Sequence, residues 1–145
     1  MNVSDMNGLQ LMKAMANREI PLPNIANIVP MLDGQAARGK MSIRVRANEN
    51  HLNSQNAVHG GFASTVLDTA MACAVHTMLN SNSGVCTIDL SLKYVKPIPV
   101  DMDLYAEGQV DEMTAQIGFA SGRLRDDDGN IYVTASTSCM LLKSN

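Results

Sequence analysis

The sequence predicts an α+β fold, in which one antiparallel β-sheet wraps around a single long central helix. Two observations support this prediction. Residues 59–80 are apolar on nearly every side of a helical wheel, as is typical of a buried helix. From Val85 onward, four successive segments alternate apolar and polar residues with a period of two, which indicates four strands that each bury one face. The apolar helix must be covered, and the apolar face of such a sheet is the cover that this chain offers.

The part of the chain before this helix contains a shorter helix and one clear strand. Residues 4–16 place their apolar side chains on one face, and Ser4 or Asp5 is expected to cap that helix. Prolines in the following segment prevent one continuous helix there. Residues 40–47 alternate between apolar and polar side chains, which predicts a half-buried strand. The polar, Asn-rich residues 48–58 then predict a loop.

The second half of the chain predicts four antiparallel strands. Two prolines, Pro97 and Pro99, mark the turn between the first two of them. The last two form a hairpin across 126–130, where Asp-Gly is a strong turn signal. No internal repeat or linker interrupts the chain, so a single domain is expected over residues 1–145, in which residues 1–24 form an N-terminal helix and a proline-containing lead-in.

Composition narrows the range of functions. A chain of 145 residues with 46% hydrophobic and 17% charged residues is expected to fold around a core rather than to be disordered. Its net charge of −3 argues against nucleic-acid binding, which usually needs a basic face. Neither a membrane span nor a signal-peptide pattern is present in the sequence, so no membrane partner and a cytoplasmic location are expected.

The cysteines do not suggest a metal or disulfide site. Cys73, Cys86 and Cys139 are odd in number, widely spaced and without a CxxC pair. They are expected to be reduced, buried thiols that act as small core hydrophobes. No metal or redox cofactor is expected.

Asp68 is the first candidate for chemistry, because it is the only formally charged side chain between Glu49 and Asp89. It lies in the middle of the predicted buried helix, where aspartate is unfavourable and where an unpartnered carboxylate costs several kcal/mol. Two interpretations remain open. Asp68 either belongs to a polar stripe that faces solvent or another subunit, or it is a reactive carboxylate.

The start of the same helix is the second candidate. His59, Gly60 and Gly61 follow a polar loop and open the apolar segment. Glycines allow a ligand to approach backbone N–H groups that have no helical partner, and these donors suit an oxygen that gains negative charge during acyl transfer. A Gly-Gly helix start is weak evidence by itself, because glycine at a loop–helix junction is often only a steric requirement.

Together these residues form a more specific pattern. Asn53 lies six residues before His59, and Asp68 follows nine residues after it. Thr87 lies where the first strand after the apolar helix is predicted to begin. The segment HLNSQNAVHGGFASTVLDTAMACAVH resembles the PaaI-like (phenylacetic acid degradation type) branch of the hotdog-fold acyl-CoA thioesterases. GLQLMKAMANREIPLPNIA, SLKYVKPIP and DGNIYVTASTSCMLL extend the resemblance over nearly the whole chain.

The resemblance implies a hotdog fold and a role for each motif residue. Asp68 matches the catalytic carboxylate, acting as general base or as nucleophile, and the Gly60 N–H matches the donor that polarises the thioester carbonyl. Asn53 matches a polar residue beside that carbonyl. His59 is implied to orient the loop or to contact the leaving sulfur, and Thr87 to help hold the attacking water. Asn56 departs from the pattern, because many relatives carry glycine there, and this leaves the loop shape open.

The expected activity is hydrolysis of an acyl-CoA thioester to the free acid and CoA, with an aromatic or medium-chain acyl group among the candidates. One alternative is a hotdog dehydratase or hydratase, although its His-Phe-Pro type motif is missing. Another is a non-catalytic acyl-CoA-binding module. Four basic residues either contact CoA phosphates or belong to solvated strand faces: Lys93, Lys96, Arg123 and Arg125. The remaining histidines, His51 and His76, are expected on the surface.

The spacing along the helix also predicts an oligomer. Gly60 and Asp68 are about 12 Å apart along a helix axis at ~1.5 Å per residue, whereas a general base must approach to ~3 Å or act through one water. A second, antiparallel chain would place its Asp68 opposite the first chain's Gly60. A homodimer with shared active sites is therefore expected, either alone or as half of a tetramer.

Overall fold

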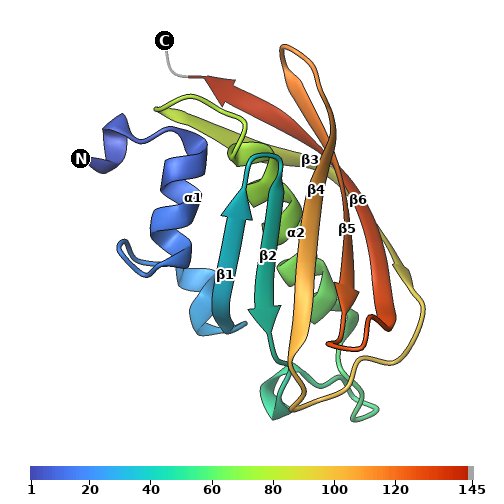
Figure 1. Cartoon of the computed structure of the whole chain (residues 1–145). Helices are drawn as coiled ribbons and strands as arrows, with labels where there is room; N and C mark the ends of the chain where they lie inside the picture. The colour runs from blue at the N-terminus through green and yellow to red at the C-terminus, as the bar shows by residue number, and fades with distance from the viewer. Residues whose placement is uncertain (144–145) are drawn as a thin grey trace.

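A six-stranded antiparallel sheet packs one face against a long helix in this computed structural model, which describes residues 1–143 (Figure 1). The expected α+β architecture is therefore confirmed. The long helix is α2 (Gly60–His76), and a shorter helix is α1 (Gly8–Ala16). The strands are β1 (Met31–Ala37), β2 (Lys40–Val45), β3 (Ser83–Tyr94), β4 (Leu104–Met113), β5 (Ile117–Arg125) and β6 (Ile131–Lys143).

The order of strands in the sheet is β1-β2-β4-β5-β6-β3. The chain leaves α2 into β3 at one edge, and β4 then lies beside β2 in the interior of the sheet. Helix α1 packs against β1 at the other edge, as Figure 1 shows. Within residues 1–143, β3 is paired only with β6, so its outer backbone edge is open.

The core lies between α2 and the inner face of the sheet. Alternate residues of β2, namely Met41, Ile43 and Val45, are buried as the sequence predicted. The apolar side chains of α2 that face them are fully buried: Ala63, Val66, Leu67, Ala70, Met71, Ala74 and Val75. Gly108 of β4 lies where α2 crosses, since a Cβ there would come within 2.5 Å of the Ala70 carbonyl oxygen. The absence of a side chain at this position allows close helix–sheet packing.

The N-terminal region differs from the prediction in two ways. Helix α1 begins at Gly8 rather than near Ser4, and Asn7 caps it by accepting from the Gln10 N–H, while the Gln10 side chain accepts from the Asn7 N–H. This reciprocal pair satisfies two backbone donors, which neither Ser4 nor Asp5 does. Strand β1 was not predicted individually, because its sequence, MLDGQAA, lacks a regular alternation.

Strand β3 also departs from a simple alternation. A bulge lies between Thr87 and Asp89, so that Thr87 pairs with Cys139 and Leu90 pairs with Thr137. Both of these β6 partners are buried, and therefore Thr87 and Leu90 face α2 together. A regular alternation along this strand would place Thr87 and Leu90 on opposite faces. The bulge moves its hydroxyl to the helix side instead.

Candidate functional site

Asp68 and Thr87 meet between α2 and β3. The Thr87 hydroxyl donates a hydrogen bond to Asp68 Oδ1 at 2.8 Å. Asp68 is half-buried, as is Thr87. The other Ser and Thr side chains of the expected polar stripe, Ser64 and Thr65, both donate to the Gly61 carbonyl of their own helix. Asp68 Oδ1 therefore has a fixed partner, and no protein hydrogen bond is found on Oδ2 within residues 1–143.

The N-terminus of α2 is held by its own preceding residue. His59 is the N-cap, and its ring Nδ1 accepts from the Gly61 N–H at 2.7 Å. The Phe62 N–H donates to the His59 carbonyl at 3.0 Å. Among the described residues the Gly60 N–H has no such partner, so it is the donor that an incoming oxygen can use.

Asn53 organises the loop before α2. Its Oδ1 accepts from the N–H groups of Gln55 and Ala57, at 2.9 and 3.1 Å, and its own N–H donates to the Ala57 carbonyl at 2.8 Å. Asn56 adopts a positive φ of 60°, which asparagine tolerates better than most residues and which glycine adopts freely. The loop therefore keeps the backbone conformation of a glycine at the position where the sequence departs from its relatives.

Tyr94 is a site residue that the sequence reasoning did not assign. Its hydroxyl donates to the Gly60 carbonyl at 2.6 Å, and partial burial raises the pKa of Tyr94. A cavity of about 360 Å³ lies beside this contact, with walls formed by Val58, Gly60, Tyr94, Val95, Lys96, Pro97 and Ile98. Of the four basic candidates, only Lys96 lines this cavity.

The site residues form two groups in one chain. Asp68 and Thr87 are one group, while His59, Gly60 and Tyr94 surround the helix start and Asn53 organises the loop before it. Each group includes one residue of β3, the strand at the open edge of the sheet. Thr87 belongs to the first group, and Tyr94, seven residues further along the strand, belongs to the second. Within one chain the structure brings Thr87 to Asp68, but it does not bring Asp68 to Gly60.

The remaining candidates have structural surroundings. His51 is buried rather than on the surface: its Nδ1 accepts from the Asn48 N–H, its Nε2 bonds to the Ile28 carbonyl, and its ring packs on Phe62. His76 is half-buried, and this lowers its pKa.

The prediction that all three cysteine side chains are buried holds only in part. Burial raises the pKa of Cys73 to about 12, and it also raises the pKa of the buried Cys139, so neither is a ready nucleophile. Cys86 is exposed on the edge strand, and its predicted burial was wrong, because its side chain lies on the outer face of β3 opposite the exposed Met140.

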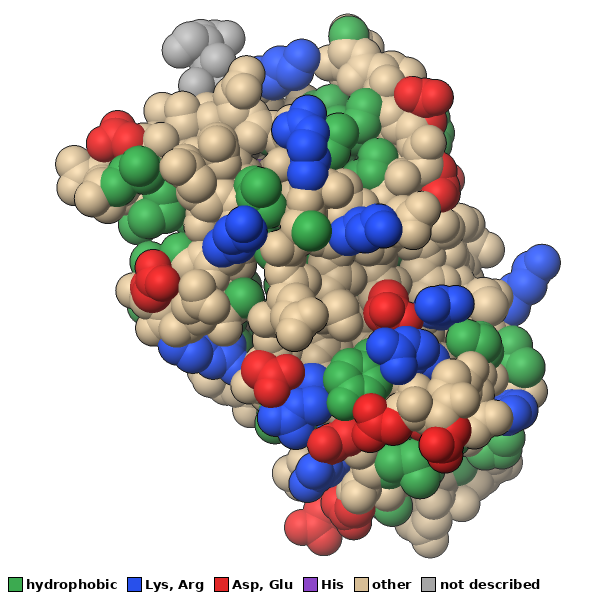
Figure 2. Space-filling view, viewed as in Figure 1, with side chains coloured by type: hydrophobic (Ala, Val, Ile, Leu, Met, Phe, Trp, Pro, Cys, Tyr) green, Lys and Arg blue, Asp and Glu red, His purple; other side chains and the backbone are tan. Residues whose placement is uncertain are grey.

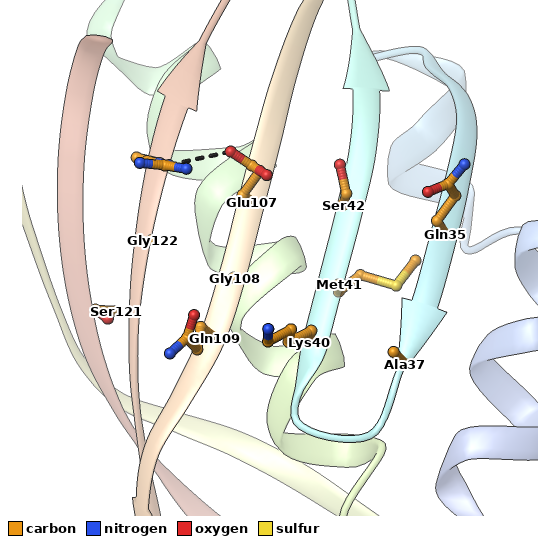
Figure 3. A pocket seen from close by; sticks show the side chains of 11 residues that line it. Gln35, Ala37, Lys40, Met41, Ser42, Glu107, Gly108, Gln109, Ser121 and Gly122 are labelled. Atoms are coloured by element: carbon orange, nitrogen blue, oxygen red, sulfur yellow. Dashed lines mark hydrogen bonds and ion pairs between the residues drawn. The ribbon is translucent and has the colours of Figure 1, made fainter. Parts of the chain in front are cut away.

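A larger hollow, of about 560 Å³, lies on the outer face of the sheet (Figure 3). Its floor consists of small residues, and longer polar side chains such as Lys40, Gln109 and Glu107 rise around it. The sheet separates this hollow from α2, and no site residue lines it. Arg123 and Arg125 both bond to Glu107 here, and Figure 2 shows acidic and basic side chains intermingled over this face.

Within residues 1–143, no three His, Cys, Asp or Glu side chains gather as a potential metal site. None of the described helices has the length and apolar character needed to cross a bilayer.

Residues 55–133 match the family described as the thioesterase superfamily. An esterase candidate of Halobacterium salinarum is 36% identical over 90 residues, which cover 59% of this chain and 58% of that protein. Human acyl-coenzyme A thioesterase 13 is 26% identical over 86 residues, covering 59% of this chain and 61% of the human enzyme. The chain thus spans less than two thirds of these relatives.

Solved structures match over a larger share. A Bacillus halodurans protein crystallised with CoA has a TM-score of 0.75 and 26% identity, covering 90% of this chain and 87% of that one. The Escherichia coli PaaI protein from the phenylacetic acid degradation operon has a TM-score of 0.77 at 16% identity, covering 92% and 94%. The expected hotdog architecture and the resemblance to PaaI-like proteins are confirmed.

Proposed function

Because the chain belongs to the thioesterase superfamily, we propose that it hydrolyses acyl-CoA thioesters to the free acid and CoA. The observation that carries the proposal is the Asp68–Thr87 pair, in which a single neutral donor holds the one carboxylate of the largely apolar helix α2. A carboxylate with one oxygen fixed and the other available is suited to accept a proton from water.

The reaction follows from the two groups of residues. Water attacks the thioester carbonyl carbon while Asp68 accepts the proton of that water. The Gly60 N–H, at the positive end of the α2 dipole, stabilises the negative charge that develops on the carbonyl oxygen. The C–S bond then breaks, and the departing thiolate takes up a proton to leave as free CoA. In this scheme Thr87 fixes the carboxylate, and His59 lies where the sulfur departs.

A second copy of the chain completes the site in this proposal. Asp68 is tied to Thr87 and Gly60 is tied to Tyr94, so both halves of the site are anchored to β3. Antiparallel pairing of two β3 edges across a two-fold axis near Leu90 would bring Thr87 of one chain toward Tyr94 of the other. The open edge of β3, with Ile88 52% exposed at its bulge, supports this interface.

The cavity beside Gly60 supports CoA as the leaving group. Its walls combine apolar side chains with the ammonium group of Lys96. A ligand that fits this chemistry has an extended, weakly polar arm and an anionic group at a distance from the reacting carbonyl. The thioester-linked pantetheine arm of CoA and its phosphates have this arrangement. Arg123 and Arg125 do not line this cavity, and both are paired with Glu107 on the outer face.

The decisive test is a thiol-release assay with aromatic, short-chain and long-chain acyl-CoAs. Hydrolysis predicts stoichiometric free thiol and free acid, and loss of both in the Asp68→Asn variant. A shifted double bond without thiol release would instead identify a dehydratase or hydratase. Tight binding of acyl-CoA with neither product would identify a binding module.

A further inference from the structure

Three groups at the start of α2 are connected by two short hydrogen bonds. The Tyr94 hydroxyl donates to the Gly60 carbonyl at 2.6 Å, and the Gly61 N–H donates to His59 Nδ1 at 2.7 Å. The Gly60 carbonyl and the Gly61 N–H belong to the same peptide group. Tyr94 is therefore connected to the His59 ring through a single peptide unit, although the two residues are 35 positions apart in the chain.

Each glycine makes room for one end of this connection. A Cβ at Gly60 would lie 2.9 Å from the Tyr94 hydroxyl oxygen, and a Cβ at Gly61 would lie 2.8 Å from His59 Nδ1. Real Cβ atoms do not approach other atoms so closely, so a side chain at either position would displace Tyr94 or His59. The Gly-Gly pair is thus explained by two neighbouring side chains, in addition to any ligand that approaches the backbone.

The connection has a chemical consequence for His59. Because Nδ1 accepts a backbone hydrogen bond, a neutral His59 ring carries its proton on Nε2. A donor at the carbonyl end of a peptide group polarises that group and strengthens its N–H as a donor. The Tyr94 hydroxyl keeps its proton for this purpose, since partial burial raises the pKa of Tyr94.

We propose that Tyr94 is a positioning residue that acts through the Gly60–Gly61 peptide to hold the His59 ring in its Nε2-protonated form. It does so by donating to the Gly60 carbonyl, which strengthens the Gly61 N–H bond to Nδ1. A His59 ring held in this way presents an N–H donor to the leaving sulfur rather than a lone pair. This role rests on the proposed thioester hydrolysis, but the state of the ring is a property of the free protein.

The test compares Tyr94→Phe with a matched control. Tyr132→Phe removes the same atom from a tyrosine whose hydroxyl donates to Asp126 at 3.0 Å, outside the site. In Tyr94→Phe we expect kcat to fall about three- to tenfold, the range for losing one neutral hydrogen bond, with KM little changed. In Tyr132→Phe we expect the melting temperature to fall while kcat stays at the wild-type value.

Nitrogen-15 NMR of the free protein at about pH 8 gives a readout that does not depend on activity. The wild-type His59 ring should show the Nε2–H tautomer, and Tyr94→Phe should shift its ring nitrogen resonances and speed exchange of the Gly61 amide. A second variant, Gly61→Ala, places its methyl group against Nδ1 and should change the same ring resonances more strongly.

The outcomes separate this inference from the proposed function. Unchanged His59 and Gly61 signals in a folded Tyr94→Phe protein would overturn the positioning role, whatever the activity. Changed signals in a protein that releases no thiol from any acyl-CoA would support the connection and contradict the hydrolase proposal instead.

Discussion

The Thr87 hydroxyl lies 2.8 Å from Oδ1 of Asp68, across the gap between the edge strand and the central helix. This contact exists because the bulge after Thr87 turns its side chain to the inner face of β3. It leaves Asp68 as an acceptor with a defined orientation, and the first prediction depends on that orientation.

Replacing Asp68 with asparagine should lower kcat by about 10²–10⁴ and leave KM nearly unchanged, because the shape is kept and the proton acceptor is lost. Steady-state kinetics with an acyl-CoA substrate measure both constants. Asp111→Asn is the matched control, since Asp111 also accepts from a hydroxyl, that of Ser121 at 2.9 Å, but on the outer face. Wild-type turnover in Asp68→Asn would remove this residue from the mechanism.

Two substitutions at Asn53 should separate its structural role from a catalytic one. Asn53→Ala removes the acceptor of two loop N–H groups, so both the melting temperature and kcat should fall. Asn53→Asp keeps that acceptor and loses only the amide donor, so kcat should fall about tenfold or more while the melting temperature changes little. If Asn53→Asp turns over like the wild type, its amide does not contact the substrate.

Lys96→Gln should raise KM for acyl-CoA about three- to tenfold, because it removes one charge-assisted contact to a phosphate. KM for an acyl-pantetheine ester, which has no phosphate, should not change. Lys93→Gln is the control, since Lys93 is exposed near the end of β3, three residues before Lys96, but does not line the cavity beside Gly60. Equal effects of both substitutions would indicate a general charge effect rather than a contact.

Complementation should show that the site is shared between chains. In the proposed mechanism Asp68→Asn chains are nearly inactive and Asn53→Asp chains keep about a tenth of the wild-type activity or less, yet a heterodimer contains one site with both lesions and one intact site. After subunit exchange in an equal mixture, about a quarter of the wild-type activity should return. If labelled subunits demonstrably exchange and no activity returns, both halves of the site lie within one chain.

The β5–β6 turn should make folding sensitive to acid. The Asn130 side chain, helped by Tyr132 and two backbone N–H groups, lowers the pKa of the Asp126 carboxyl in the folded state. Its stabilising effect is therefore present above its unfolded pKa of about 3.9, and it is lost as the pH falls through that value and then through the lower folded pKa.

Melting temperatures of the wild type and Asp126→Asn, measured from pH 7 down to about pH 2.5, should converge as the acid carboxyl loses its charge. Asp128→Asn serves as the control, because its exposed side chain makes no hydrogen bond among those of the described residues. A constant difference between the wild type and Asp126→Asn across this range would contradict the prediction.

The parts of the fold and site that could be predicted are those with a local signature. The apolar period of α2 and the single charge of Asp68 are visible within a few helical turns. Strand β1 has no such signature, since Asp33, Gly34 and Gln35 interrupt any alternation. The place of β3 at the sheet edge depends on its pairing with β6, which no local pattern encodes.

The residues of the candidate site also divide into those with a local sequence signature and those without one. His59 and Gly60 are recognisable from their spacing, whereas the Tyr94 contact with Gly60 joins positions 34 residues apart. Thr87 was found through the resemblance, but alternation alone gave it the wrong face, because a bulge shifts the period of a strand by one residue.

The position of β3 also has a consequence for synthesis of the protein. Its only partner in the sheet is β6, whose residues follow it by about forty positions or more, so β3 has no neighbour to join until nearly all of the described chain has left the ribosome. Contacts of such large sequence separation form late and slowly. The helix that carries Asp68 is made well before the strand that orients it can be fixed, and a nascent chain stalled before Ile131 would hold an unpaired β3 and an apolar α2 that β3 and β6 do not yet cover. Such a chain is a substrate for chaperones and is prone to aggregation.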